Sequence, residues 1–481
     1  MTLTRLWAFL AIGLPVLAAT IASLPTVDLA YHLRAGAITL DTGAIPRVDT
    51  FTFTAAGQPW QNQQWGAQVL LDVAYRLAGW TGLVLLRAAL VGCAFGLLFD
   101  ACRRRSGSVR IAAWLALAAF ACAAVTLGLR PQLFAVALFS AVLWVVVQRR
   151  ERPGLTWLAV PLILLWTNVH GSFFLGPLLV GIGLVEDLVD RDPAWRRSAA
   201  LLVGALVATV VNPFGLTVWS YVAGISTNEL ITSRVTEWQP TTVRTPEGVL
   251  FYGSAGLVAI AFVVAARRGR VVRPTTLLWL VPFLAIGAYA VRGLAWWPLV
   301  AAVVVAGLAA VPADASSSSR PVRPAPEGTP MMRRTNLVLT AILVLAAVAA
   351  LPAWRPIDPG LRAPAGVVGT APPGITGALR GLVRPGDRLL APQPWGSWFE
   401  FALPDTLVAI DSRIELFPIE VWNNLDRIET GATGWEAALA GWGVSIVVAS
   451  PDQRDFVTRL QAAGWRDAFH DEDGTVLVLA R

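Results

Sequence analysis

The sequence predicts an α-helical polytopic membrane protein with a small α/β domain at its C-terminal end. Of the 481 residues, 56% are hydrophobic and 14% are charged, whereas an ordinary soluble domain carries roughly 25% charge. Apolar runs such as 3–24, 249–266 and 337–351 approach the roughly 20 residues that cross the hydrocarbon core of a bilayer. Beyond about residue 354, apolar segments shorten to strand length and turn signals separate them.

Hydropathy predicts about eleven membrane-spanning segments. They lie near 4–25, 81–101, 111–128, 132–148, 155–169, 172–188, 198–211, 249–266, 275–291, 294–311 and 336–352. The first segment has one arginine and no clear cleavage site, and further spans follow it. We therefore expect a first transmembrane helix rather than a signal peptide.

All the basic residues are arginines, and they gather in short loops between the apolar runs. The clusters lie at 103–105, 149–152, 191–197, 267–273 and 320–334. A cytoplasmic N-terminus puts every cluster on the cytoplasmic side, which is the positive-inside pattern. The net charge of +7 thus indicates membrane topology, and no nucleic-acid partner is predicted.

This topology divides the chain into four parts. They are a transmembrane domain at 1–312 with a large outer loop at 26–79, a cytoplasmic linker at 313–334, a last transmembrane helix at 335–353, and an extracytoplasmic α/β domain at 354–481. The linker is rich in Ser, Pro and Arg. A second outer loop is expected at 212–248.

The C-terminal domain alternates short apolar strands with helices, which is typical of a small α/β layer. Strands are predicted at 388–391, 406–410, 444–449 and 475–479, and helices at 435–441 and 452–464. The domain contains no Gly-rich phosphate loop, nucleophile elbow or zinc motif. The three cysteines of the chain lie in or beside predicted spans without metal-ligand spacing, so neither a disulfide nor a zinc site is predicted.

The first outer loop carries the acidic residues of most interest. Residues 27–36 are expected to form an interfacial helix, in which Asp28 and His32 share one face because they are four residues apart. Asp49 follows in the same loop. Each has an ordinary explanation as well: Asp28 as a solvated acid near a helix N-terminus, Asp49 as a turn cap, and His32 as part of an amphipathic surface.

Several further polar residues lie at span ends that the topology places on the outer side. They are Arg130, Asn168, His170, Asn212, Glu237 and Arg292. Taken singly, the arginines can extend to lipid headgroups, the asparagines can cap helix ends, the histidine can lie in the interfacial belt, and the glutamate can be a solvated loop acid. Their convergence on one side of the membrane is what predicts a site there.

The order of these parts resembles the GT-C glycosyltransferases, over about the first 310 residues. The motif stretches are 28–36 with 43–49, Arg130-Pro131-Gln132, 168–171 and Asn212-Pro213-Phe214-Gly215. The chain looks most like the bacterial branch of protein mannosyltransferase, aminoarabinose transferase and RgtA–D-type enzymes.

This resemblance implies sugar transfer from a polyprenyl-phosphate-linked donor to an extracytoplasmic acceptor, which is a glycan, lipid or protein, at the bacterial cytoplasmic membrane. It implies that Asp28 is the base or the group that orients the acceptor, with Asp49 as second candidate. Many relatives have two adjacent acids, whereas Asp28 is flanked by Val27 and Leu29. No divalent cation or other cofactor is therefore predicted.

Within this hypothesis, Arg130 and Arg292 stabilise the departing lipid phosphate, because a guanidinium group presents a fork of donors to phosphate oxygens. His32, His170 and Glu237 are the further candidates for substrate binding. In the C-terminal domain, the segment at 409–415 either contacts the acceptor or forms a salt-bridged turn, and we favour the turn.

Two other classes of protein fit the composition. A transporter would place polar residues near the bilayer midplane, in discontinuous helices with an internal repeat, but the sequence has no such repeat and its polar groups gather on one face. A non-catalytic scaffold for envelope assembly would have a filled helical bundle. An outer cavity lined by Asp28 and the arginines would favour the enzyme.

Overall fold

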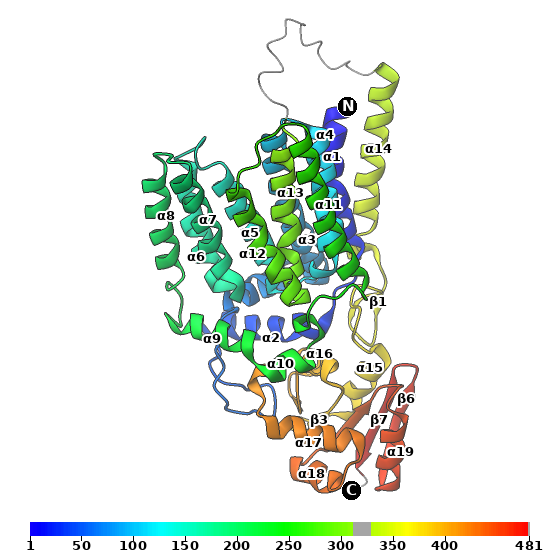
Figure 1. Ribbon diagram of the computed structural model, residues 1–481. Coiled ribbons are helices and arrows are strands. Elements are labelled where there is room, and N and C mark those ends of the chain that lie inside the picture. The colour runs from blue at the N-terminus through cyan, green and yellow to red at the C-terminus, as the bar shows by residue number, and fades with distance from the viewer. Residues whose placement is uncertain (311–328, 480–481) are drawn as a thin grey trace, which may run out of the picture. The chain divides into compact units, whose positions relative to one another are not determined.

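The computed structural model describes residues 1–310 and 329–479 (Figure 1). Most of the linker predicted at 313–334 lies outside the described residues. The chain forms two compact units. The first, which we call the helical unit, comprises Met1–Ile21, Val84–Val222 and Thr232–Leu351. The second, which we call the loop–sheet unit, comprises Ala22–Leu83, Ala223–Ile231 and Pro352–Arg481.

The helical unit is a bundle of apolar helices. Its elements are α1 (Leu3–Ile21), the later part of α3 (Trp65–Ser106), α4 (Val109–Ala123), α5 (Pro131–Val147), α6 (Ala159–Val169), α7 (Leu175–Val189), α8 (Trp195–Ala208), α11 (Pro246–Arg267), α12 (Thr275–Tyr289), α13 (Trp297–Leu308) and α14 (Pro330–Ala349). Two short helices, α9 (Thr217–Thr227) and α10 (Glu229–Arg234), run across the boundary between the two units.

Within the described residues, seven helices are long and apolar enough to cross a membrane, and three further apolar helices have 10–17 residues. The chain is therefore a multi-pass membrane protein, as predicted. The expected number of about eleven spans stays a prediction, since several of those segments form helices shorter than a full crossing.

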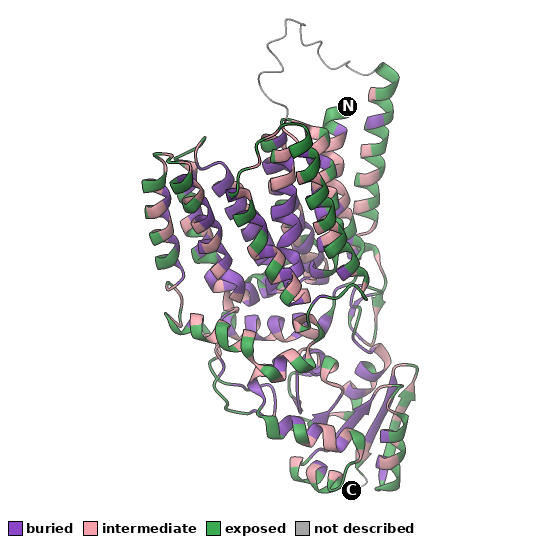
Figure 2. Cartoon of the chain, in the orientation of Figure 1, coloured by how far each residue is buried: buried purple, intermediate pink, exposed green. Residues whose placement is uncertain are grey.

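The interior of the helical unit is built on α5, which is buried along almost its whole length, and on the first part of α13, where residues 297–303 are all buried. The ring of Phe139 on α5 contacts Trp296 at 5.1 Å and Phe283 at 5.4 Å between ring centroids. By contrast, the apolar residues of α11 and α14 are mostly exposed (Figure 2). Exposed Leu, Ile and Val along a whole helix are unfavourable in water but suit a surface that faces lipid.

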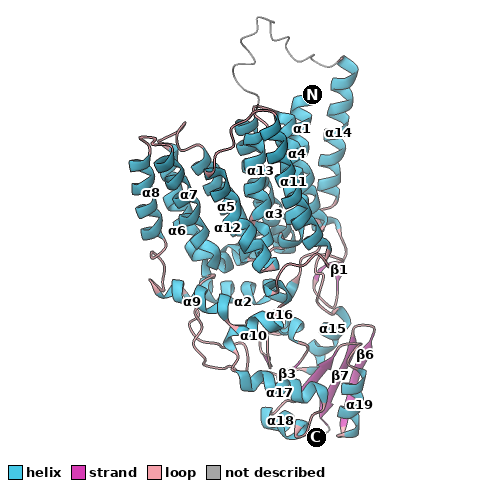
Figure 3. Ribbon diagram, in the orientation of Figure 1, coloured by secondary structure: helices cyan, strands magenta, loops and turns pink. Residues whose placement is uncertain are grey.

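The loop–sheet unit contains a five-stranded sheet in the order β4-β3-β5-β7-β6. Three of these strands, β3, β6 and β7, are labelled in Figure 3. The strands are β3 (Arg388–Leu390), β4 (Leu407–Val408), β5 (Ile446–Ala449), β6 (Trp465–Asp471) and β7 (Gly474–Leu479). The pairs of β3 with β4 and β5 are parallel, and those of β7 with β5 and β6 are antiparallel. The small C-terminal sheet domain that the sequence predicts is therefore present.

The domain contains three helices and three strands that the sequence analysis did not predict. The helices of the domain are α15 (Pro373–Leu382), α16 (Gln393–Ala402), α17 (Ile419–Thr430), α18 (Trp435–Trp442) and α19 (Arg454–Ala462), and a separate pair of strands consists of β1 (Ile357–Asp358) and β2 (Ala363–Pro364). The predicted helices correspond to α18 and α19. The missed elements are α15, α16, α17, β1, β2 and β6.

The first outer loop is part of the same unit as this sheet. It forms α2 (Thr26–Thr42) and the first part of α3, which is kinked at Ala78 and Gly79. Two parallel bridges join the loop to the C-terminal domain, between Leu24 and Val368 and between Thr52 and Val408. The predicted division, which grouped the loop with the transmembrane domain, therefore differs from the compact units of the structure.

Candidate active site

The predicted base Asp28 lies in the first turn of α2, where its charge complements the helix dipole. Its side chain is half-buried. His32 follows one helical turn later, as the spacing predicts, but it is only 2% exposed rather than at an open surface. Its Nδ1 lies 3.3 Å from Nε2 of Gln68 on α3, and its ring packs against Tyr31. In these contacts His32 holds α2 against α3.

Asp49, the second acidic candidate, is 1% exposed, and its carboxylate is saturated with donors. Oδ1 accepts hydrogen bonds from the backbone N–H of Phe51 at 3.3 Å and from Nη2 of Arg413 at 2.6 Å. Oδ2 accepts from the backbone N–H and the hydroxyl group of Thr52 at 3.1 and 2.6 Å. These contacts are those of a turn that is fixed to the C-terminal domain.

Arg413 is the centre of a buried charge cluster made with Asp49, Glu400 and Asp411, which we call the buried cluster. Nε of Arg413 donates to Oδ2 of Asp411 at 2.8 Å, and Nη2 also bonds Asp411. Nη2 lies 4.0 Å from Oε1 of Glu400. Each of the four side chains is at most 1% exposed. The salt-bridged turn favoured for 409–415 is thus present, with partners far away in the sequence.

Three aromatic rings surround the guanidinium group of Arg413. Its carbon Cζ lies 4.6 Å from the centroid of Trp60, 4.7 Å from that of Phe51 and 5.7 Å from that of Tyr31. All three rings come from the first outer loop. A cation over ring faces in a dry site is stabilised by about 2 kcal/mol, so this side chain contributes to holding the loop and the C-terminal domain together.

The buried cluster changes the ionisation of its members. Burial, reinforced by the negative charge of Asp411, raises the pKa of Glu400 well above its usual 4.5, although Arg413 opposes the shift. Burial alone would lower the pKa of Arg413, but Asp411 and the neighbouring acids outweigh it and raise that pKa. A protonated Glu400 can donate a hydrogen bond to Asp411, whereas two charged carboxylates could only accept.

In the helical unit, Arg130 and Glu237 form an ion pair, with Nη1 of Arg130 2.7 Å from Oε1 of Glu237. Arg130 precedes the buried helix α5, where Pro131 occupies the first helical position and fixes the turn. The side chain of Arg130 is 15% exposed and that of Glu237 36% exposed. The two predicted residues are therefore neighbours, and their pair is partly accessible to solvent.

Arg292 lies close to this pair because the backbone segment around it contacts the segment that contains Glu237. The backbone N–H of Val291 donates to the carbonyl of Gln239 at 3.1 Å, and Cζ of Arg292 lies 5.3 Å from the ring centroid of Trp238. Nε2 of Gln132 donates to the carbonyl oxygen of Arg292 at 3.1 Å. The structure therefore brings Arg130, Glu237 and Arg292 into one neighbourhood of two cations and one anion.

His170 lies between α6 and the short helix Gly171–Phe174 and acts as its cap. Its Nδ1 accepts a hydrogen bond from the backbone N–H of Ser172 at 3.1 Å, which places the proton of the neutral ring on Nε2. The side chain is 8% exposed. Asn212 likewise caps a turn by accepting from the backbone N–H of Phe214 at 2.8 Å. The contact of Asn212 matches the helix-end explanation given for the asparagines, whereas the capping role of His170 was not predicted.

The predicted residues thus fall into two groups. Arg130, Glu237, Arg292 and His170 belong to the helical unit, and Asp28, His32 and Asp49 belong to the loop–sheet unit. Sequence reasoning missed Glu400 and the central role of Arg413. The only local signal was the Asp411-Ser412-Arg413 run, and nothing in it indicated a partner more than 300 residues away.

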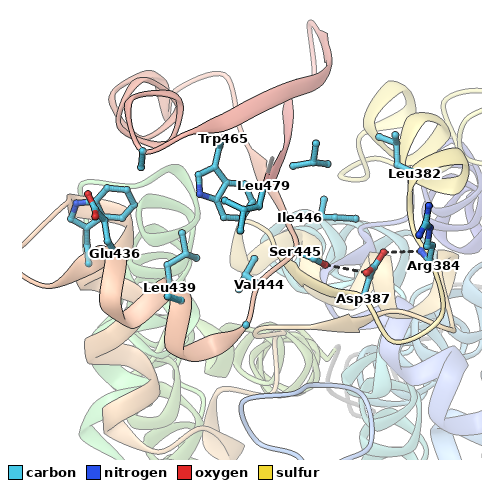
Figure 4. A pocket seen from close by; sticks show the side chains of 15 residues that line it. Leu382, Arg384, Asp387, Glu436, Leu439, Val444, Ser445, Ile446, Trp465 and Leu479 are labelled. Atoms are coloured by element: carbon cyan, nitrogen blue, oxygen red, sulfur yellow. Dashed lines mark hydrogen bonds between the residues drawn. The ribbon is translucent and has the colours of Figure 1, made fainter. Parts of the chain in front are cut away.

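A cavity of about 700 Å³ lies elsewhere in the loop–sheet unit, between α18 and the strands β5, β6 and β7 (Figure 4). Its wall combines Leu439, Trp465 and Leu479 with a few polar groups. One of them, Asp387, accepts hydrogen bonds from the backbone N–H of Arg384 at 2.8 Å and from the hydroxyl group of Ser445 at 3.2 Å. None of the predicted site residues lines this cavity.

In the described ranges 1–310 and 329–479, no three side chains of His, Cys, Asp or Glu are gathered into a group that could hold a metal ion.

No protein-family model and no curated protein sequence matches the chain. Among solved structures, it is similar to the oligosaccharyltransferase AglB from Archaeoglobus fulgidus in complex with an inhibitory peptide and a dolichol-phosphate, with 11% identity over 93% of this chain and 70% of that chain and a TM-score of 0.53. It is equally similar to the same organism's oligosaccharyltransferase tethered to an acceptor peptide containing the NVT sequon, with 12% identity, 93% and 68% coverage and a TM-score of 0.53. At 11% and 12% identity this likeness concerns the fold, and it agrees with the polytopic helical fold with a small C-terminal domain that the sequence predicts.

Proposed function

We propose that the chain is a glycosyltransferase that moves a hexose or pentose from a polyprenyl-phosphate-linked donor to an acceptor outside the bacterial cytoplasmic membrane. The observation that carries the proposal is the likeness of fold, over 93% of the chain, to an oligosaccharyltransferase solved with a dolichol-phosphate. Nucleotide sugars are charged and stay in the cytoplasm, so an outward-facing transferase needs a lipid carrier. The finer placement, beside protein mannosyltransferase, aminoarabinose transferase and RgtA–D-type enzymes, is part of the same proposal.

In the proposed reaction, a hydroxyl oxygen of the acceptor attacks the anomeric carbon of the sugar. The hydroxyl proton passes to the carboxylate of Asp28, and the bond between the anomeric carbon and the phosphate oxygen breaks with its electron pair remaining on the phosphate. Asp28 is preferred to Asp49 because it is half-buried, whereas the Asp49 carboxylate already accepts four hydrogen bonds. A saturated carboxylate has no lone pair in position for an incoming proton.

Arg292 and Arg130 are assigned to the developing charge on the lipid phosphate. Arg130 is paired with Glu237, and the guanidinium group of Arg292 stacks on Trp238 beside this pair, with Cζ 5.3 Å from the ring centroid. Glu237 is assigned to orienting the acceptor. His32 and His170, which are buried and hold helices in place, support these groups rather than touch the substrate.

The alternatives of transport and of a non-catalytic scaffold predict different behaviour. A transporter would move its ligand across a sealed vesicle without breaking a covalent bond, and a scaffold would bind neither donor nor product. The fold likeness supports a transferase over both, and the next two experiments separate the three classes.

The first experiment compares the wild-type chain with Asp28→Asn in liposomes supplied with a panel of polyprenyl-phosphate-linked hexoses and pentoses. Loss of the base is expected to lower kcat by roughly 100- to 10,000-fold with little change in KM, because general base catalysis contributes on that order. An Asp28→Asn protein that stays folded and fully active would overturn the assignment.

The second experiment measures binding of polyprenyl phosphate, which is independent of the sugar. Arg292→Gln is expected to weaken binding roughly 10- to 100-fold, as removal of one hydrogen bond to a charged group predicts. Arg244→Gln removes an exposed arginine of the outer loop predicted at 212–248, which also carries Glu237, and serves as the matched control. Equal affinities for the Arg292→Gln and Arg244→Gln proteins would contradict the role of Arg292 in binding phosphate.

A further inference from the structure

The first turn of α2, which carries Asp28, receives no capping hydrogen bond from the side chain of its own N-cap residue. Its N-cap position is occupied by Pro25, and no side chain of the cap residue bonds the helix. The first backbone N–H groups of a helix need partners from outside. Here the N–H of Thr26 donates at 2.9 Å to the hydroxyl oxygen of Thr370, which is 344 residues away in the sequence. The hydroxyl groups of Thr26 and Thr370 lie 2.6 Å apart.

The chain that enters α2 is fixed by the same segment of the C-terminal domain. The backbone N–H of Leu24 donates to the carbonyl of Val367 at 2.6 Å, and the N–H of Gly369 donates to the carbonyl of Leu24 at 3.0 Å. Leu24 is fully buried. This strand-like pairing sets the direction in which the backbone approaches the helix.

A second hydroxyl group reaches the residue directly before Asp28. The Ser412 hydroxyl donates to the carbonyl oxygen of Val27 at 2.9 Å. Ser412 is itself held by Ser397, whose hydroxyl oxygen accepts from the backbone N–H of Ser412 at 3.3 Å. The next residue is Arg413, which is fixed to Asp49 at 2.6 Å. The position of Ser412 is thus set by the buried cluster.

We infer that Thr370 and Ser412 are positioning residues for Asp28, and that the C-terminal domain takes part in the reaction by fixing the first turn of α2. The inference rests on the proposed function, in which Asp28 is the base. The hydroxyl of Thr370 bonds the helix two residues before Asp28 and that of Ser412 one residue before it, on the N–H and C=O sides of the backbone. Neither touches the substrate.

The physical reason is the steep dependence of catalysis on geometry. A displacement of a catalytic group by about 1 Å can cost on the order of 100-fold in rate. A helix whose first turn has lost its external cap frays, so the carboxylate spends less time in the productive position. Binding of donor and acceptor by other residues is unaffected, and the loss therefore falls on kcat rather than on KM.

The test uses the full-length chain in liposomes and the pair of variants Thr370→Val and Thr370→Ser. Thr370→Val keeps the shape but removes the hydroxyl group, and we expect kcat to fall about 10- to 100-fold with KM unchanged. Thr370→Ser keeps the hydroxyl group and is expected to restore kcat. Ser412→Ala is expected to act in the same direction, with Ser412→Thr as its rescue.

The matched control is Thr430→Val on α17, since the Thr430 hydroxyl bonds only the carbonyl of Asp426 in its own helix at 2.6 Å. Its kcat is expected to equal that of the wild-type chain. Amide hydrogen exchange over residues 26–31 supplies a second measurement that does not depend on activity. Exchange there is expected to be faster in Thr370→Val and unchanged in Thr430→Val.

Each combination of results decides the inference. Faster exchange together with a lower kcat supports it, while a change in only one of the two measurements, or in neither, overturns it. Failure of the proposed function is distinguished by Asp28→Asn: if that protein is fully active while exchange in Thr370→Val is faster, the clamp on α2 exists but Asp28 is not the base.

Discussion

A carboxyl group buried beside two other acids has a direct effect on how the protein responds to pH. Because the pKa of Glu400 is raised in the folded chain, the folded state binds a proton that the unfolded state releases. Stability therefore decreases as the pH rises above 4.5, the usual glutamate value, with a slope of at most about 1.4 kcal/mol per pH unit. The decrease continues until the pH exceeds the raised pKa.

We expect Glu400→Gln to remove this part of the pH dependence. The amide stays neutral and nearly isosteric, so the thermal midpoint of the variant should fall less than that of the wild-type chain between about pH 5 and pH 8. Thermal unfolding in detergent measures the difference. Glu436→Gln, which changes an exposed glutamate of α18, is the control, and identical pH curves for Glu400→Gln and the wild-type chain would contradict the prediction.

Residue-scale reasoning from the sequence succeeded where chemistry is local. The turn around Asp411 and Arg413 and the cap at Asn212 follow from neighbours in the chain. The ion pair of Arg130 with Glu237 joins residues that were both selected, but their contact was not foreseen. The pairing of Arg413 with Asp49 is set by tertiary structure. A single sequence gives no signal that two residues 364 positions apart are in contact.

At the scale of elements, the packing of α2 on α3 depends on one small residue. A Cβ atom at Gly36 would lie 2.2 Å from the carbonyl oxygen of Gln68, a backbone atom that cannot move aside. The two helices therefore approach more closely than they could with any residue other than glycine at position 36. This contact also holds Gln68 beside His32, one turn after Asp28.

We expect Gly36→Ala to destabilise the protein by about 1–3 kcal/mol, the usual cost of overpacking. Gly381→Ala provides the contrast, because that glycine lies in α15 with open space around it, and alanine there should stabilise by up to about 1 kcal/mol. Thermal midpoints of the two variants give the comparison. A lower midpoint for both, or for neither, would show that the close approach at Gly36 is not limiting.

Helices and strands, like single residues, were predicted correctly where the sequence signal is local. Long apolar helices were located because their hydropathy is independent of context, and β5 and β7 because each is a run of apolar β-formers between turns. The amphipathic helices α15, α16 and α17 were missed: α15 and α16 contain proline in their first turn, and α17 begins directly after Pro418. Strand β6 was missed because its alternation contains charged residues on the exposed face.

For the whole molecule, the proposed topology puts the loop–sheet unit outside the cell and the arginine-rich loops inside. We expect Thr430→Cys, in a chain whose Cys93, Cys102 and Cys122 are replaced by alanine, to react with a membrane-impermeant thiol reagent in intact cells. Glu151→Cys should react only after the membrane is permeabilised. Both replaced positions are exposed, so accessibility within the fold does not limit labelling.

The reverse labelling pattern would place Asp28 in the cytosol and exclude an outward-facing transferase. The membrane topology could be predicted from the sequence because the distribution of arginines is a property of the whole chain rather than of any residue. The division into units could not be predicted, since nothing in the composition of the first outer loop indicates that its partner is the C-terminal domain.

The union of residues 22–83 with residues 352–481 has a consequence for biogenesis. The loop emerges from the ribosome early, but the sheet, helix caps and cluster partners that complete it are synthesised last. Until translation ends, the nascent loop lacks the groups that bury Asp49 and cap α2, and proteases can reach it. We expect a chain cut short before residue 352 to insert its helices into the bilayer, but its α2 would lack the cap from Thr370 and its Asp49 would lack the ion pair with Arg413.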